Sequence, residues 1–217
     1  MPWDEADYKV ENRLWSEGFR RVMGLDEVGR GCLAGPVVAA GVILDPAKPV
    51  SGITDSKSIT AGRRTVLAGE IRKHALFCTI AFSDHKEIDS LNILKASLLA
   101  MSRCVDQCHP PPDFLLIDGN KGLDGLMIRS ETIIGGDRKS ASIGAASILA
   151  KVWRDEWMAR LHKEYPEYGW DRNAGYPTVA HYKALTDHGF SPHHRRSFRL
   201  RTERLNSRPV NGPITDR

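Results

Sequence analysis

No apolar stretch of the roughly 18 residues needed to cross a membrane occurs in this sequence, so we expect no membrane-spanning helix. The beginning of the chain also lacks the basic-then-apolar order of a signal peptide, because the acids Asp4, Glu5 and Asp7 stand there instead. The four cysteines show no paired spacing typical of a disulfide framework. We therefore expect a protein of the reducing cytoplasm that makes no contact with a membrane.

Zinc-binding motifs are equally scarce. Cys104, Cys108 and His109 lie close together, but spacing by four residues also places two cysteines on one face of a helix, and no second Cys/His pair accompanies them. We do not expect a zinc site. The chain also shows no internal repeat and no second domain boundary, and 217 residues with 41% hydrophobic content suit one large domain with at most an appendage.

The formal charge of +4 is small, but it is unevenly distributed. Residues 193–217 hold seven arginines against only Glu203 and Asp216, so the body of the chain is close to neutral. A basic terminus on a neutral body favours contact with a polyanion, most simply a nucleic-acid backbone. The alternative is a solvated terminus that only aids solubility. We expect residues 201–217 to form a basic, disordered tail.

Alternation of helical and strand patterns predicts an α/β protein. Expected helices cover 4–20, 60–74, 85–107, 142–165 and 178–188, and expected strands cover 21–27, 36–44, 75–82, 114–117 and 131–134. The helix over 85–107 follows from apolar residues at steps of three and four. We expect residues 1–20 to form an N-terminal helix and residues 21–200 to form the main domain.

Carboxylates occur where three of the expected strands end. Asp26 and Glu27 close the first strand, Asp118 ends the strand at 114–117, and Asp137 follows the strand at 131–134. Neighbouring strand residues point to opposite faces, so Asp26 and Glu27 converge only at a strand end or sheet edge. Each acid alone could be a solvated turn residue. Together they would repel one another unless cations held them, and all-carboxylate ligation suits Mg²⁺ or Mn²⁺.

Two further features could contact a substrate. The Gly29-Arg30-Gly31 corner offers backbone that a ligand can approach closely, and Arg30 has planar donors suited to phosphate. Tyr176 lies in a loop between Gly175 and Pro177, where an aromatic ring can stack on a sugar or base. The alternative for Tyr176 is a ring that only packs at the base of its loop. On the longest helix we expect Lys151 to lie on a solvated face and Asp155 to support the site.

Ordered sequence blocks over residues 21–200 make the chain resemble the ribonuclease HII, or type 2 ribonuclease H, family. The blocks are Gly24–Gly31, Asp55–Lys57, Leu91–Leu94, Leu116–Asn120, Ala145–Val152, Arg154–Asp155, Gly175–Thr178 and His193–Phe198. The resemblance implies a ribonuclease H-like mixed sheet flanked by helices, with a C-terminal helical portion over the active-site cleft. It also implies an endonuclease that acts as a monomer, hydrolysing RNA in RNA–DNA hybrids and cutting 5′ of single ribonucleotides in duplex DNA.

The same resemblance implies roles for individual residues. It makes Asp26, Glu27, Asp118 and Asp137 the ligands of two Mn²⁺ or Mg²⁺ ions in a two-metal hydrolysis that leaves 3′-hydroxyl and 5′-phosphate ends. The substrate-binding residues that it implies are Gly29, Arg30 and Gly31 for the 2′-hydroxyl, Tyr176 for the sugar at the junction, and Arg195 and Arg196 for phosphates.

The chain departs from the family pattern at four positions. Where the family commonly has Lys, Ser, Lys and Thr, this chain has Gly135, Arg138, Ala174 and Trp153. No carboxylate is lost, but two cations are, and Arg138 and Lys139 could compensate. These changes bear on affinity and pH optimum more than on reaction type.

Three alternative interpretations of this pattern remain. A binding-only relative would not need all four acids. A DNA-only nuclease such as a transposase or resolvase would not need a reader of the 2′-hydroxyl. A type 3 ribonuclease H would need an N-terminal substrate-binding domain, for which the residues before the first strand leave no room.

Overall fold

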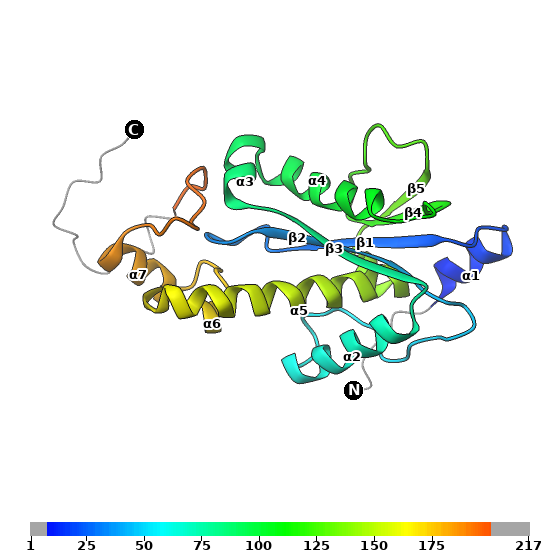
Figure 1. The fold of residues 1–217 in the computed structure, drawn as a ribbon, viewed down its shortest axis with the longest axis horizontal. Coiled ribbons are helices and arrows are strands. Elements are labelled where there is room, and N and C mark those ends of the chain that lie inside the picture. Colours follow the sequence, from blue (N-terminus) through cyan, green and yellow to red (C-terminus); the bar gives the residue numbers. More distant parts are fainter. Residues whose placement is uncertain (1–7, 201–217) are drawn as a thin grey trace.

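The computed structural model describes residues 8–200. The first turn of the helix expected at 4–20 and the tail expected at 201–217 therefore lie outside the described residues. A five-stranded sheet runs through the centre of the molecule in the order β3-β2-β1-β4-β5 (Figure 1). Its strands are β1 (Val22–Val28), β2 (Val37–Ile43), β3 (Phe77–Ser83), β4 (Phe114–Asp118) and β5 (Arg129–Ile133). β1, β2 and β3 pair antiparallel, whereas β4 is parallel to β1 and to β5, which confirms the mixed sheet.

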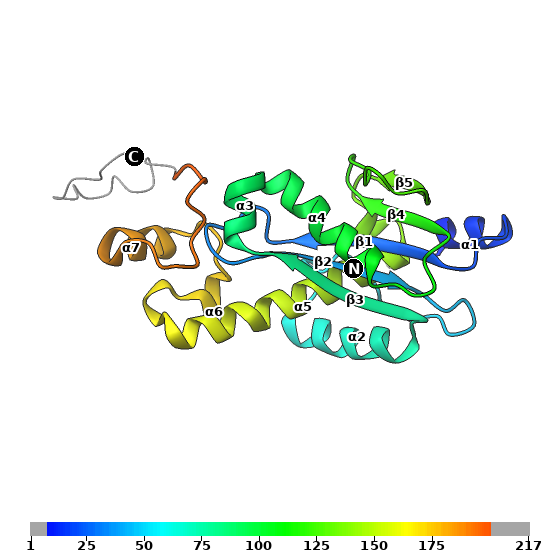
Figure 2. The same cartoon turned by 45° about the horizontal axis from the view of Figure 1, so that its top comes forward.

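Helices cover both faces of this sheet (Figures 1 and 2). α2 (Ala61–His74) and α5 (Ala141–Glu164) lie on one face, and α3 (His85–Leu91) and α4 (Ile93–Asp106) lie on the other. α1 (Lys9–Ser16) packs beside the start of β1, and α6 (Trp170–Asn173) and α7 (Val179–His188) gather at the far end of α5. Short 3₁₀ helices form at η1 (Gly136–Arg138) and η2 (Pro166–Tyr168). None of the helices within residues 8–200 is long and apolar enough to cross a membrane.

β2 is buried along its whole length, as its unbroken apolar sequence predicts. Val38, Ala40 and Val42 pack in the core on the α5 side, whereas Ala39 and Ile43 belong to the core on the α4 side. The alternation matters for the site, because β1 follows the same rule. Its successive side chains also point to the two opposite layers.

The helix expected over 85–107 is wrong as a single element, because Asn92 divides it into α3 and α4. Asn92 has φ 72° and ψ 164°, a conformation that no α-helix contains. Its side-chain oxygen accepts hydrogen bonds from the backbone N–H groups of Leu94 (3.0 Å) and Lys95 (3.2 Å), and so it caps α4. The apolar spacing continues across the break, which is why the pattern alone predicts one helix.

The start of α5 is fixed against the sheet from two sides. Ser140 caps the helix, and the buried carboxylate of Glu11 in α1 accepts hydrogen bonds from the Ser140 hydroxyl (2.5 Å) and the Ser142 N–H (2.9 Å). A Cβ on Gly24 would lie 2.2 Å from the carbonyl carbon of Ser142, so α5 presses directly on β1. This close packing brings the first turns of α5 beneath the acids of β1.

Candidate active site

Asp26 and Glu27 lie near the end of β1 and point to opposite layers of the molecule. Asp26 faces α5, where Ser147 donates a hydrogen bond to its carboxylate, and it is only 6% exposed. Glu27 faces α4 and forms an ion pair with Arg30 (Oε1 to Nη1, 2.8 Å). Because β1 ends at Val28, both carboxylates reach the same opening at the strand end.

The other two acids arrive through parallel pairing. The register of β1 with β4 sets Leu25 beside Ile117, so that Asp118 comes next to Asp26. Asp118 accepts a hydrogen bond from the Gly136 N–H (2.7 Å), which ties the end of β4 to η1. Asp137 lies in that same turn. All four acids line one cleft of about 310 Å³, together with Ser56, Lys57, Ser147, Tyr176 and the Gly29–Gly31 corner.

Asp26, Glu27 and Asp137 have raised pKa values. Burial raises the pKa of Asp26 well above its ordinary value, and the charges of Glu27 and Asp118 raise it further. Burial also raises the pKa of Glu27, against the opposing effect of Arg30. The pKa of Asp137 is raised, mainly by burial and then by Asp55 and Asp118. An opposite charge in the cleft would relieve each of these shifts.

A divalent cation suits this cleft by chemistry. The donors are carboxylates, the ligands that Mg²⁺ and Mn²⁺ prefer, and among the residues that the structure describes no cysteine or histidine lines the cleft. Within residues 8–200, no three acidic, histidine or cysteine side chains stand close enough to form a finished metal cage. The fit to the expected ions rests on the donor chemistry and on the shared cleft of the four acids, and not on a finished coordination shell.

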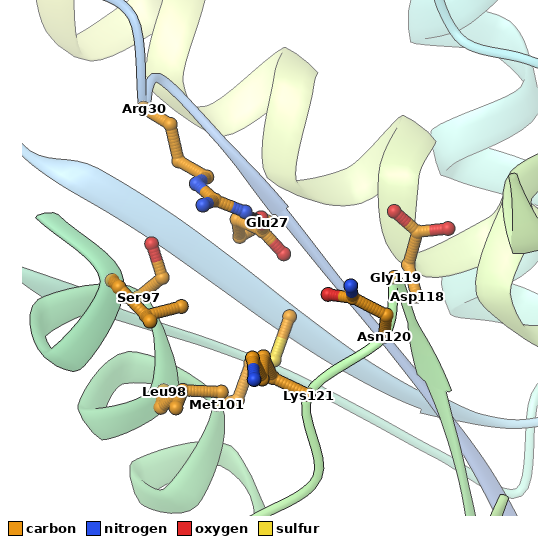
Figure 3. Close-up of a pocket in the computed structure, with 10 residues that line it drawn as sticks. Glu27, Arg30, Ser97, Leu98, Met101, Asp118, Gly119, Asn120 and Lys121 are labelled. Carbon is orange, nitrogen blue, oxygen red and sulfur yellow. Dashed lines mark hydrogen bonds and ion pairs between the residues drawn. The ribbon is translucent and has the colours of Figure 1, made fainter. Parts of the chain in front are cut away.

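A smaller hollow of about 50 Å³ opens on the α4 side of Glu27 and Asp118 (Figure 3). Leu98 and Met101 of α4 form its apolar floor, and the loop after β4 supplies Lys121 at its rim. Arg30 points toward Glu27 at one side of this hollow. The two hollows share Glu27, Arg30 and Asp118, so they form one continuous surface around the acids.

Lys57 and its neighbours are site residues that the sequence-based list of ligands leaves out. Lys57 lines the cleft, and Ser56 exchanges a hydrogen bond with Ser147 (Oγ to Oγ, 3.0 Å). Ser147 in turn contacts Asp26. The block Asp55–Lys57 already marks this loop as part of the family pattern, and that was the available signal.

Tyr176 and Gly31 stand on the walls of the cleft. The Tyr176 ring makes cation–π contacts with Lys151, whose Nζ lies 5.7 Å from the ring centroid, and with Arg154, whose guanidinium carbon lies 5.8 Å from it. Burial raises the pKa of Tyr176 to about 12, so its hydroxyl remains protonated at neutral pH. A Cβ on Gly31 would meet nothing within 4 Å, which leaves this stretch of backbone open to a ligand.

Two expectations for basic residues need correction. Lys151 is not on a solvated face: its side chain is 15% exposed, and its Nζ lies 2.6 Å from Asp155 Oδ1. Arg195 is 1% exposed, and its guanidinium donates to backbone carbonyls, so the expected phosphate contact does not fit its position. Arg196 is exposed and stacks on Phe190 (4.5 Å), outside the residues that line the cleft.

Of the four departures from the family pattern, only Arg138 acts on a carboxylate, because its charge lowers the pKa of Asp137 against the effect of burial. Gly135 takes a left-handed conformation (φ 64°) and begins η1, and Ala174 is also left-handed (φ 46°). Trp153 stacks on Trp157 with ring centroids 5.2 Å apart, on a part of α5 that does not line the cleft. Lys139 donates to the Ile134 carbonyl (2.8 Å), so it is tied back to its own turn.

Comparison with known proteins places this arrangement in context. The family model described as Ribonuclease HII matches residues 23–201. A ribonuclease HII of Salinibacter ruber is 52% identical over 193 residues, covering 88% of this chain and 96% of the relative. A ribonuclease HII of Ruegeria pomeroyi is 53% identical over 195 residues, covering 90% and 83%. The crystal structure of ribonuclease H2 from Pyrococcus horikoshii OT3 superposes with a TM-score of 0.68 at 25% identity, covering 82% of this chain and 93% of that one.

Proposed function

The chain belongs to the ribonuclease HII family, a family of metal-dependent nucleases with ribonuclease H activity, and from that premise we propose the specific reaction it performs. The enzyme hydrolyses RNA in RNA–DNA hybrids and cuts on the 5′ side of single ribonucleotides in duplex DNA. The products carry 3′-hydroxyl and 5′-phosphate ends. It acts as a monomer in the cytoplasm.

One observation carries this proposal. Three carboxylates from β1 and β4 and a fourth from η1 line the same cleft as the open backbone of Gly31 and the ring of Tyr176. The carboxylates supply the chemistry of phosphodiester hydrolysis, and the other two supply a means of recognising a ribose. A nuclease that acted on DNA alone would need only the carboxylates.

The positions of the acids support a role for each of them as a metal ligand. Asp26, Glu27, Asp118 and Asp137 would hold two divalent cations, Mn²⁺ or Mg²⁺. Such cations, when bound, activate a water nucleophile and neutralise charge on the departing 3′ oxygen. Ser147 keeps the Asp26 carboxylate turned toward the cleft, and Arg30 does the same for Glu27.

The walls of the cleft would bind the substrate. Backbone groups of Gly29, Arg30 and Gly31 would contact the 2′-hydroxyl in the minor groove, and the open space beside Gly31 leaves room for that approach. Tyr176 would stack on the sugar next to the junction. Lys57, a cation in the cleft, would meet a phosphate near the cut, and the exposed Arg196 would meet one farther along the strand.

Replacing one ligand tests the proposal. Asp118→Asn removes a ligand charge without changing side-chain size, so we expect cleavage to fall by about 100-fold or more while the circular dichroism spectrum stays unchanged. Asp124→Asn, in the exposed loop after β4, is the matched control and should cleave normally. Normal turnover by the Asp118 variant on both substrates would contradict the metal assignment.

A further inference from the structure

Two buried arginines, Arg154 and Arg195, lie behind the walls of the cleft. They are 0% and 1% exposed, and neither forms an ion pair with any residue in the range 8–200. Burying an unpaired guanidinium is costly unless its N–H groups are satisfied by good acceptors. The acceptors they use show what the two side chains do.

Arg195 holds the corner that contains the proposed reader. Its Nε donates to the carbonyl of Gly35 (3.0 Å), its Nη1 to that of Arg30 (2.9 Å), and its Nη2 to that of Gly29 (2.7 Å). Two of these three residues belong to the Gly29–Gly31 corner itself. The buried guanidinium therefore fixes the outline of that backbone from behind.

Arg154 of α5 joins the same stretch of chain to the Tyr176 loop. Its Nε donates to Pro36 O (3.0 Å), its Nη2 to Ala34 O (3.1 Å), and its Nη1 crosses to Ala174 O (2.8 Å). The same guanidinium lies over the Tyr176 ring. One side chain therefore ties the segment that follows the corner to the Tyr176 loop and its aromatic ring.

Backbone hydrogen bonds complete the connection. The Leu33 N–H donates to Gly175 O (2.8 Å), the Arg195 N–H to Leu33 O (2.9 Å), and the Gly35 N–H to His193 O (3.0 Å). Segments near residues 33, 175 and 194 are thus bound together, although they are far apart in sequence. An isolated β-bridge between Ala34 and His194 marks the same junction.

The glycine at position 29 is explained by this packing. Gly29 has φ +92°, and a Cβ there would lie 2.2 Å from Arg154 Nε. The absence of a side chain at Gly29 therefore makes room for the buried Arg154. At Gly31 the absence of a side chain leaves open space on the side proposed to face the substrate. The absence of a side chain therefore has different physical consequences at positions 29 and 31 of the same motif.

We propose that Arg195 and Arg154 are positioning residues that hold the Gly29–Gly31 corner and the Tyr176 loop as one preformed reader of the ribose. This inference rests on the proposed function of that corner and loop. Only a planar guanidinium offers donors in several fixed directions, so a lysine could keep the charge but could not hold three carbonyls in the same geometry. A reader fixed in advance loses less freedom when the substrate binds.

Arg195→Lys in the full-length chain tests the proposal. We expect hydrogen exchange of the Leu33 and Gly35 amides to rise about 10-fold or more, while amides of β2 keep their protection. We also expect kcat/KM on a single-ribonucleotide duplex to fall about 10-fold more than on a continuous hybrid, mainly through KM. Arg21→Met is the control: Arg21 also donates to a carbonyl (Pro110, 2.7 Å), but at the opposite end of β1, and its loss should change neither readout.

The outcomes distinguish the proposed positioning role of Arg195 and Arg154 from the proposed function on which it rests. If the wild type cuts the single-ribonucleotide duplex, unchanged exchange near Leu33 overturns the proposal, and so does an equal loss on both substrates. If Arg195→Lys fails to fold, Arg154→Lys is measured in the same way, with the same two results deciding. Failure of the proposed function looks different, because the wild type itself would then leave the single-ribonucleotide duplex intact while cutting the hybrid.

Discussion

Asp26 illustrates how a catalytic residue can weaken the fold that holds it. Its carboxylate is buried beside Glu27 and Asp118, and burial is the main cause of its raised pKa. The unfolded chain ionises Asp26 at its ordinary pKa of about 3.9, whereas the folded chain retains the proton to higher pH. Stability is therefore lost as pH rises from the unfolded pKa through the folded one.

Asp26→Asn should consequently stabilise the metal-free protein at neutral pH. Thermal unfolding in the presence of chelator should show a higher Tm for the variant at pH 7, by about 2–4 °C for each kcal/mol recovered. At pH 3.5 the advantage should shrink toward zero, because Asp26 is then largely protonated in both states. A variant less stable than the wild type at pH 7 would show that the Ser147 contact outweighs the burial of charge.

A substitution of the single residue Tyr176 tests how the substrate junction is recognised. Tyr176→Ala removes the ring, so we expect single-ribonucleotide cleavage to fall about 10-fold more than cleavage of a continuous hybrid, in line with the loss of one stacking contact. Tyr176→Phe keeps the ring and should retain the ratio of the two rates. Steady-state kinetics on both substrates provides the measurement. An equal effect of Tyr176→Ala on both would remove its role at the junction.

At the scale of elements, the junction between α3 and α4 depends on one side chain. Asn92 is held at φ 72° and ψ 164°, a region that glycine occupies more easily, and its side chain caps α4. Asn92→Ala loses the cap and keeps the strain, so the free energy of unfolding in urea should fall by about 1–2 kcal/mol. Asn92→Gly loses the cap but relieves the backbone, and it should lie within about 0.5 kcal/mol of the wild type. Equal losses in both variants would show that the cap alone matters.

The elements also show what a sequence can and cannot predict. The strand ends that carry Asp26 and Asp118, and the turn after β5 that carries Asp137, follow from local patterns, because apolar runs and the acids after them are close in sequence. The break at Asn92 does not, since apolar spacing contains no information about a single dihedral angle. The role of Arg195 depends on carbonyls more than 100 residues away, as do two of the three hydrogen bonds of Arg154. Charge alone therefore suggests a phosphate contact for Arg195, whereas the fold supplies backbone carbonyls.

At the scale of the whole molecule, the C-terminal region divides into two parts with different tasks. Residues 191–198 pack against the segment around Ala34, where His194 forms a β-bridge with Ala34. Most of the charged residues that follow Phe198 in the sequence are arginines. Truncation after Phe198 should leave hydrogen exchange near Leu33 unchanged. It should weaken substrate affinity and flatten the dependence of log Kd on log salt, because fewer counterions are released. Binding titrations at several salt concentrations provide the measurement, and an unchanged slope would mean that the tail does not touch the nucleic acid.

The most direct test of the account uses duplex DNA that carries one ribonucleotide, incubated with Mg²⁺ or Mn²⁺ and, in parallel, with chelator. The account predicts a single metal-dependent cut on the 5′ side of the ribonucleotide, leaving a 3′-hydroxyl. Cleavage of a continuous hybrid without this cut would keep the carboxylate site but contradict the reader formed by Gly29–Gly31 and Tyr176. No cut in either substrate would contradict the nuclease itself and favour a protein that only binds.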